Sequence, residues 1–227
     1  MTTELLDNIV WHSLIGPHAG FSLGTSRARR LLPGFTPFIG FSNPARPDFA
    51  GLAPFCNEGE RFFCGAWSER VESAWPVDFE VVAHQMVWDG STPAADVSLA
   101  AVQLDATHVP QMLELVTLTQ PGPFGPRTVE LGDYFGVFED GRLVSMAGER
   151  LGADAVREVS GVCTHPDFRG RSLARRLMEK LIRLEIGRGQ TPFLHVMYDN
   201  EHALRMYRQM GFRTHREVLL RIVSCEK

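Results

Sequence analysis

The residues that point most directly to chemistry form a turn between a strand and a helix: Arg169, Gly170, Arg171, Ser172, Leu173 and Ala174. The first amide groups of a helix have no acceptors within the helix, and the positive end of the helix dipole lies beside them. Gly170 lets a ligand approach the backbone closely. Because several N–H groups converge at such a turn, a pyrophosphate fits it better than a single carboxylate does. The sequence therefore predicts a local anion site in a chain whose formal net charge is -4.

The elements around this turn are clearly patterned. A strand over residues 158–164 leads into it, and a helix over 172–186 follows, with an apolar stripe at helical spacing. A buried strand is expected at 193–198 and a second helix at 201–210, ended by a left-handed glycine cap at Gly211. We expect a last strand, at residues 217–223, to close the sheet.

Upstream, a strand over residues 98–104 precedes Asp105, which is expected to cap a helix that runs through Leu118. A stiff loop rich in proline and glycine follows. Residues 134–138 and 143–149 flank an Asp-Gly pair, which is typical of a β-hairpin.

The first part of the chain reads as α/β. Strands rich in aromatic and β-branched residues are expected at 38–41, 61–67 and 79–88, with short helices between them. Residues 89–96 are small and polar and contain glycine and proline, so we place a domain boundary there. This predicts an N-terminal domain over 1–92 and a second domain over 97–227.

Composition excludes several classes of protein. The net charge and a pI near 6.1 give no global attraction to nucleic acid or to membranes, and the amino terminus has no export signal. The four cysteines are scattered without metal-ligand spacing, so reduced thiols, no metal and a cytoplasmic location are expected. A disulfide between Cys56 and Cys64 stays open at this point, as does a homodimer.

Two ordered motifs resemble those of the GNAT superfamily of N-acetyltransferases. The stretch V-C-T-H-P-D-F-R-G-R-S-L-A is similar to its coenzyme A signature, Q/R-x-x-G-x-G/A, with Ser172 in place of a usual glycine. Downstream, N-E-H-A-L-R-M-Y-R-Q-M-G-F resembles the second motif, N-x-x-A-x-x-x-Y-x-x-x-G-F. The resemblance covers residues 98–223. It implies a GNAT fold, in which helices flank a mixed central sheet, and the N-terminal half would be a degenerate relative of the same fold.

The resemblance also implies acetyl-CoA as cosubstrate and assigns binding residues. The turn would hold the pyrophosphate, and backbone groups of Val162, Cys163 and Thr164 would pair with the pantetheine arm like an added strand. Asn200 either contacts that arm or caps its helix, and Ala203 and Tyr207 lie in the second motif.

In the family, an amine attacks the thioester directly, so the protein supplies a base and an acid. Tyr207 matches the residue that protonates the departing thiolate. Glu158 is the first candidate base; strand alternation places it on the face of Ser160, Val162 and Thr164. Glu149 is the second candidate, and either carboxylate could instead be an ion-pair partner of Arg150 or Arg157.

The acceptor side is less defined. We place Phe124 and Arg127 from the proline-rich loop there, together with Glu149 and His195; His195 could serve a proton relay or the core. The acceptor would be a small-molecule or peptide amine. Two alternatives remain: a non-catalytic acyl-CoA-binding module that recognises a partner through its N-terminal half, and a mononucleotide-binding protein. The second lacks a G-x-x-x-x-G-K-[ST] element.

Overall fold

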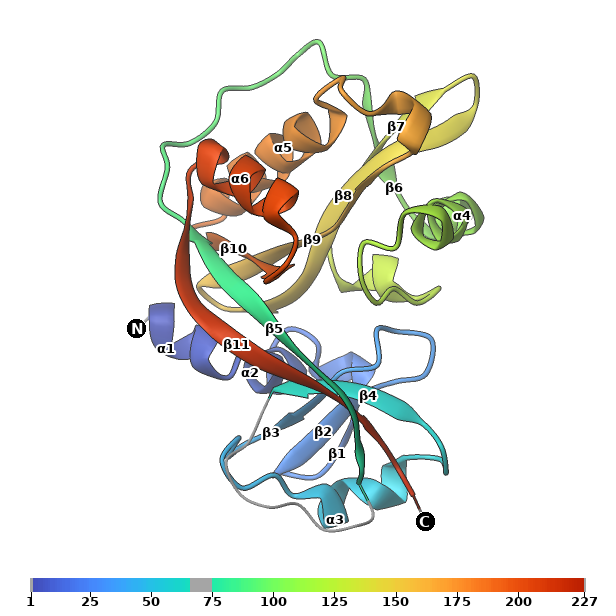
Figure 1. Ribbon diagram of the computed structural model, residues 1–227, viewed down its shortest axis with the longest axis vertical. Helices are drawn as coiled ribbons and strands as arrows, with labels where there is room; N and C mark the ends of the chain where they lie inside the picture. Colours follow the sequence, from blue (N-terminus) through green and yellow to red (C-terminus); the bar gives the residue numbers. More distant parts are fainter. Residues whose placement is uncertain (1, 66–74, 227) are drawn as a thin grey trace.

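An eight-stranded mixed sheet carries the site. The computed structural model describes residues 2–65 and 75–226 and has the strand order β4-β11-β5-β10-β9-β8-β7-β6 (Figure 1). The strands are β4 (Arg61–Gly65), β5 (Val77–Trp88), β6 (Ala101–Leu104), β7 (Tyr134–Glu139), β8 (Arg142–Ala153), β9 (Val156–Thr164), β10 (Thr191–Met197) and β11 (Phe212–Ser224). Only β9 and β10 run parallel; every other neighbouring pair among the described strands is antiparallel.

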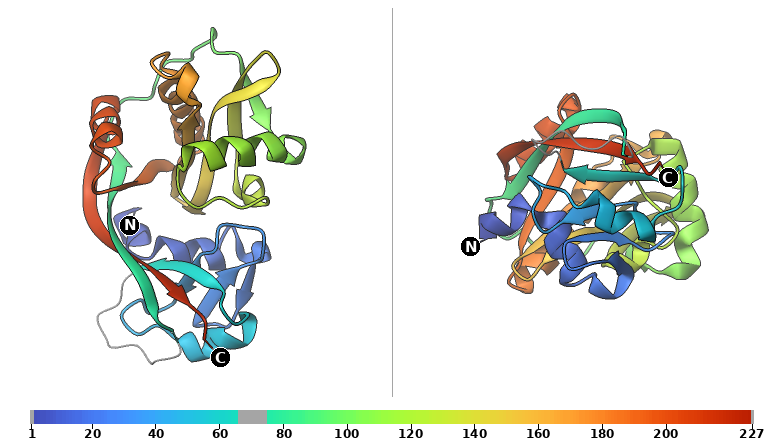
Figure 2. Two further views of the ribbon diagram at one scale, coloured as in Figure 1. Left: turned by 45° about the vertical axis from the view of Figure 1, so that its right-hand side comes forward. Right: turned by 90° about the horizontal axis from the view of Figure 1, so that it is seen from below.

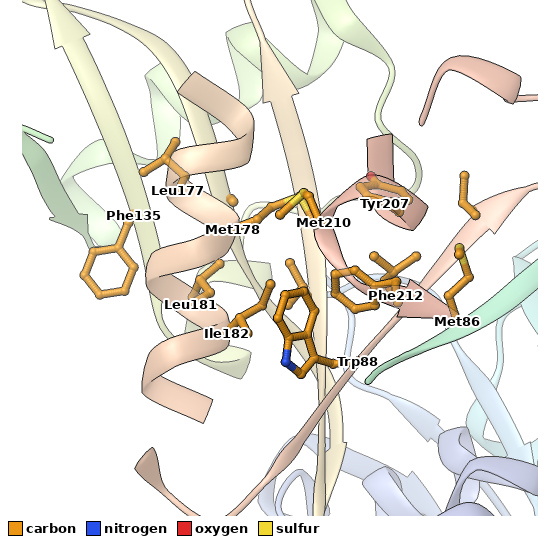
Figure 3. Close-up of a cluster of buried hydrophobic side chains, with 14 of the residues drawn as sticks. Met86, Trp88, Phe135, Leu177, Met178, Leu181, Ile182, Tyr207, Met210 and Phe212 are labelled. Atoms are coloured by element: carbon orange, nitrogen blue, oxygen red, sulfur yellow. The ribbon is translucent and has the colours of Figure 1, made fainter. Parts of the chain in front are cut away.

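Helices cover both faces of this sheet. Helix α4 (Val109–Thr119) packs on β8 and β9 from one side, and α5 (Leu173–Gly187) packs on them from the other. Helix α6 (Glu201–Met210) lies beside α5 (Figure 1). The predicted stripe of α5 is buried: Leu173 is 6% exposed, and the other four members are fully buried. Figure 3 shows these four, Leu177, Met178, Leu181 and Ile182, pointing at the core.

The N-terminal part forms a smaller lobe below the main sheet (Figure 2). It contains α1 (Thr2–Asp7), α2 (Ile9–Ile15), α3 (Phe49–Leu52) and an antiparallel sheet of β1 (Ser22–Gly24), β2 (Ala28–Leu31) and β3 (Ile39–Phe41). Short 3-10 helices lie at Ala19–Phe21, Ala53–Phe55, Ala106–His108, Thr128–Leu131 and Pro166–Phe168. The long strands β5 and β11 extend from the main sheet into this lobe, where β4 pairs with β11 (Figure 2).

The predicted mixed α/β fold, with helices flanking a central sheet, is confirmed. Gly211 caps α6 with a φ of 119°, and Asp140 and Gly141, with φ of 49° and 77°, form the turn of the β7–β8 hairpin. The last strand does not close the sheet, because β4 pairs along its far edge. The predicted strand at 61–67 is confirmed over Arg61–Gly65, and residues 66 and 67 lie outside the described residues.

The predicted division at residues 92 and 97 stays a prediction as a statement about domains. Strand β5, on the N-terminal side of that division, lies between β10 and β11 of the main sheet. The segment that follows it therefore connects two strands of one sheet. None of the described helices combines the length and the apolar character needed to cross a membrane.

All four cysteines are buried, and Cys56 and Cys64 form no disulfide. Burial raises the pKa of the Cys163 thiol to about 11, which leaves it uncharged and unreactive near neutral pH. Its predicted role in packing fits the apolar cluster under α4 that contains it.

Glu185 gives the fold a pH dependence that one substitution can reveal. Its side chain is fully buried in α5, and neither carboxyl oxygen has a hydrogen-bond partner among the described residues. Burial, followed by the nearby Glu149 carboxylate, raises its pKa well above the usual value. The folded state therefore holds a proton that the unfolded state releases above about pH 4.3, and stability falls as pH rises from there.

We expect Glu185→Gln, which is neutral at every pH, to remove this loss. The gain in unfolding free energy over the native chain should grow by up to about 1.4 kcal/mol per pH unit above about pH 4.3 until Glu185 ionises. Urea unfolding of both proteins between pH 4 and 8 measures it. A difference that is constant across this range would mean that Glu185 is ionised in the folded protein.

Candidate active site

The amides at the start of α5 are available to a ligand. Among the described residues, no hydrogen bond reaches the backbone N–H groups of residues 170–175, and the first helical bond runs from Arg176 N–H to Ser172 O at 3.0 Å. Gly170 and Ser172 have φ of 76° and 57°. Consecutive unpaired amides in such a turn form an anion-binding concavity. The structure thus has the amide arrangement that the sequence predicts for a pyrophosphate.

Ser172 occupies a left-handed conformation that costs a side chain about 1 kcal/mol or more and costs glycine nothing sterically. We expect Ser172→Gly to raise the unfolding free energy by about 0.5–1 kcal/mol and to bind coenzyme A at least as tightly as the native chain. Ser172→Ala, which keeps the Cβ atom, tests the hydroxyl separately. Thermal unfolding and calorimetry with coenzyme A measure both effects. Equal losses of affinity in the two variants would assign the hydroxyl, rather than the Cβ, to the ligand.

Most arginines around the turn are already paired with carboxylates of the protein. Three arginines bind carboxylates of the protein itself at 2.6–2.9 Å: the pairs are Arg171–Glu139, Arg175–Glu179 and Arg176–Asp96. The Arg169 side chain donates through Nε to Thr164 O at 3.4 Å and binds no carboxylate of the described residues, and Arg169 lines the main cavity with Gly170. Anion binding at this turn therefore depends mainly on the backbone.

The sheet divides beside this turn. Parallel pairing of β9 with β10 ends at Glu158, opposite Phe193, and beyond this point β10 pairs only with β5. Residues 159–164 of β9 and 195–197 of β10 then line opposite sides of one cavity of about 850 Å³. The edge of β9 that contains Val162, Cys163 and Thr164 is thus placed where an added strand could pair with it.

The predicted alternation, which placed Glu158 and Val162 on one face of β9, is interrupted by a bulge. The register of β9 against β8 shifts between Ser160 and Cys163, and Gly161 has a φ of 61°. A bulge adds one residue to the strand and reverses the faces beyond it. Val162 consequently packs with Val159 in the core under α5, whereas Cys163 lies on the face toward α4. Glu158 therefore does not share a face with Val162.

Tyr207 extends from α6 into the cavity lining. Its ring packs edge-on against Phe212 at 6.0 Å between centroids (Figure 3). Burial raises the pKa of its hydroxyl to about 12, so the group keeps its proton at neutral pH. A protonated phenol beside the cavity can donate a proton, as the sequence predicts for this residue.

Asn200 and Ala203 begin the same helix. The Asn200 side chain accepts a hydrogen bond from Ala203 N–H at 3.1 Å, which is the capping alternative of the sequence analysis. Both residues also line the cavity.

Glu158 is fully buried and does not line the cavity. Its two oxygens accept bonds from Nη2 and Nε of Arg150 at 2.9 and 3.0 Å, and Oε1 also lies 2.8 Å from Nδ1 of His195. The Arg150 charge and the His195 bond hold the pKa of this carboxyl far below its usual range, although burial alone would raise it. A carboxylate so strongly stabilised is a poor base, and the ion-pair alternative describes it better.

His195 reaches the cavity from β10, and its contacts determine which nitrogen is basic. Gln85 Oε1 accepts from Arg216 Nε at 2.9 Å and Gln85 Nε2 donates to Leu6 O at 3.2 Å, which fixes the orientation of the amide. Gln85 Nε2 also lies 3.1 Å from Nε2 of His195, so this ring nitrogen is the acceptor. Nδ1 then carries the proton and donates it to Glu158.

Two predicted acceptor residues, Phe124 and Glu149, do not line the cavity. Phe124 packs edge-on against Tyr134, at 5.8 Å between ring centroids. Glu149 is 2% exposed, binds Arg188 Nη1 at 2.9 Å and accepts from the amide of Asp133, so it is not available as a base.

Arg127 also lies outside the cavity lining. Its guanidinium binds Glu130 and stacks on Phe35 at 4.4 Å, and its amide donates to Gly34 O. The proline-rich loop docks on the N-terminal lobe through these contacts, so residues 119–123 line the cavity in its place. His165 accepts from the amide of Asp167 and serves the turn structurally.

The cavity also contains residues that sequence reasoning missed. Gln85 and Arg216 enter it from β5 and β11, and residues 6–10 and 38–41 enter it from the N-terminal lobe. For Gln85, the sequence predicts a strand over residues 79–88, but a strand pattern alone does not reveal which strands lie beside it.

Comparison with known proteins gives a consistent result. Residues 111–212 match the model of the acetyltransferase (GNAT) family. The crystal structure of a GNAT-family protein from Novosphingobium aromaticivorans is 36% identical, covers 98% of this chain and 99% of its own, and superposes with a TM-score of 0.87. A GCN5-related N-acetyltransferase from Kribbella flavida shares the fold at 17% identity, with a TM-score of 0.62 over 96% of this chain and 95% of its own.

Among curated proteins, the N-alpha-acetyltransferase RimI of Mycobacterium tuberculosis is 39% identical over 83 residues. This match covers 35% of this chain and spans about half, 51%, of the relative.

Proposed function

Because the chain belongs to the GNAT acetyltransferase family, we propose that it transfers an acetyl group from acetyl-CoA to a primary amine by direct attack in a ternary complex. One observation carries this proposal: the open edge of β9, Tyr207 and His195 line a single cavity, together with Gly170, which begins the run of unpaired amides that leads into α5. The amides would hold the pyrophosphate and β9 the pantetheine arm. Bound acetyl-CoA would supply the acetyl thioester.

We assign to His195 the role of the base that accepts the proton of the amine. An alkylamine with a pKa near 10.4 is neutral in about one molecule in a thousand at pH 7.4, a deficit of roughly 4 kcal/mol. His195 lines the cavity and its Nε2 is the acceptor nitrogen, so in this proposal Nε2 takes that proton in place of the Gln85 N–H bond. Buried Glu158, held by Arg150, keeps Nδ1 protonated and stabilises the ring when it becomes charged.

Tyr207 completes the transfer. As the nitrogen–carbon bond forms and the carbon–sulfur bond breaks, the Tyr207 hydroxyl donates its proton to the departing thiolate. The products are the N-acetylated amine and coenzyme A thiol. His195 releases the ammonium proton to solvent before the attack and then takes the second proton from the acetylated nitrogen. This second proton passes through solvent to the Tyr207 phenolate and restores its hydroxyl.

Thiol release from acetyl-CoA, followed across a panel of primary amines, tests this function. We expect release to depend on the amine and its acetylated product to appear in equal amount by mass spectrometry. Tight binding of acetyl-CoA by calorimetry, with no acetylated amine, would instead support the alternative of a non-catalytic acyl-CoA-binding module.

A further inference from the structure

The cavity continues past His195 into the space between the main sheet and the N-terminal lobe. Along the β5–β11 ribbon, three facing pairs line it: Gln85 with Arg216, Ala83 with Val218, and Val81 with Leu220. Only the first pair is polar, and Gln85 is also the register partner of His195. The lining thus changes from polar at His195 to apolar with distance along the ribbon.

Aromatic rings extend this apolar end. Phe63 of β4 and Phe38 of the lobe line the cavity and pack edge-on, 6.2 Å apart between centroids. The Arg150 guanidinium lies over the Phe38 ring, 4.9 Å from the ring centroid. A ligand that reaches from His195 toward Phe63 would therefore bury an apolar body.

The charges of the lining exclude a second cation on that ligand. Among the described residues, the lining contains three arginines, Arg150, Arg169 and Arg216, and one carboxylate, Asp7. Asp7 is already bound to Arg216 Nη1 at 2.9 Å. A second ammonium group at the apolar end would lose its hydration and find no carboxylate to pair with.

An anionic group fits no better. Arg216 directs Nε to Gln85, Nη2 to the backbone oxygen of Leu6 and Nη1 to Asp7. Arg150 is held by Glu158 through two bonds, and Arg169 lies at the predicted pyrophosphate turn. In both arginines near His195, Arg150 and Arg216, the Nε–Nη2 edge that would bind a carboxylate through two bonds is thus already occupied by the protein.

Building on the proposed function, we propose that the acceptor is a primary amine carried on an uncharged apolar body. Its nitrogen lies at His195 and Gln85, and its body lies along Val81 and Leu220 toward Phe63. Removal of this body from water supplies its binding free energy. The acceptor end is thereby selective against diamines, polyamines and amino acids.

Three amines that differ only at one end test this inference: hexylamine, 1,6-diaminohexane and 6-aminohexanoate. With saturating acetyl-CoA, we expect kcat/KM for hexylamine to exceed that for each of the others by at least about 100-fold, which corresponds to roughly 2.7 kcal/mol. Comparable values, or a preference for either charged amine, overturn the inference but leave the proposed function standing. Failure to acetylate any amine of a broad panel overturns the proposed function, and the inference with it.

A charge placed in the lining gives an independent readout. Leu220→Asp supplies the missing carboxylate, so we expect the ratio of kcat/KM for the diamine over hexylamine to rise at least about 10-fold. Leu219→Asp is the matched control, because Leu219 is the next residue of β11, is 36% exposed and does not line the cavity. Circular dichroism and thermal unfolding establish that both variants are folded. A ratio that changes equally in both, or in neither, contradicts this position of the amine's body.

Discussion

Replacement of Tyr207 by Phe is expected to lower kcat about 100-fold or more and to change the dissociation constant of coenzyme A by less than about threefold. General acid catalysis by one positioned group contributes typically 10²–10⁴-fold. The substitution removes only the hydroxyl, and the ring keeps its edge-on contact with Phe212 in the core. Single-turnover kinetics and calorimetry with coenzyme A separate the two effects.

Tyr198→Phe is the matched control for this experiment. Tyr198 lies just beyond β10, is 59% exposed and does not line the cavity, so its hydroxyl should have no effect on turnover. If Tyr207→Phe weakened coenzyme binding as much as it slowed turnover, the hydroxyl would serve binding and another group would protonate the thiolate.

The coenzyme side of the site could be predicted from sequence because it is built from one continuous segment. Strand, turn and helix follow one another from Glu158 to Ile186, and each is specified by local patterning. The cap of α6 by Asn200 and its end at Gly211 are likewise local. Such features depend on neighbours within a few residues, so a single sequence contains them.

The acceptor side could not be predicted because it depends on register between distant strands. Gln85 meets His195 across 110 positions and Arg216 across 131. The partner of a strand residue is set by sheet order, and a shift of one residue would turn it to the other face. The bulge at Gly161 shows the same limit within a single strand, since it reversed the predicted face of Val162 relative to Glu158.

These contacts between distant residues also explain why the geometry favours His195 as the base, whereas the sequence suggests Glu158 or Glu149. A carboxylate near a cavity suggests a base, but Glu158 is enclosed by Arg150 and His195 and has no exposed surface. The buried charge is compensated by Arg150 and His195, which both line the cavity, whereas Glu158 does not. In our proposal the proton-accepting role therefore lies with His195, and the sequence-based candidate Glu158 serves as its buried partner.

Glu158→Gln should destabilise the protein by about 3–5 kcal/mol, because it leaves the Arg150 charge uncompensated in a buried site. The Arg150 side chain is 12% exposed and that of Glu158 is fully buried. Glu179→Gln is the matched control: Glu179 also binds an arginine, Arg175, but at the surface of α5, where such a pair contributes about 0.5 kcal/mol or less. Urea unfolding at neutral pH measures both.

The pH dependence of this loss identifies its cause. Because the pKa of Glu158 is lowered in the folded protein, its stabilising effect is complete above the unfolded pKa of about 4.3 and is lost as pH falls from there toward the folded value. The difference in unfolding free energy between the native chain and Glu158→Gln should therefore shrink between about pH 4.3 and pH 3. A difference that stays constant over this range, or one no larger than that of Glu179→Gln, would mean that the Arg150 charge has another partner and that Glu158 does not hold His195 through an ionised carboxylate.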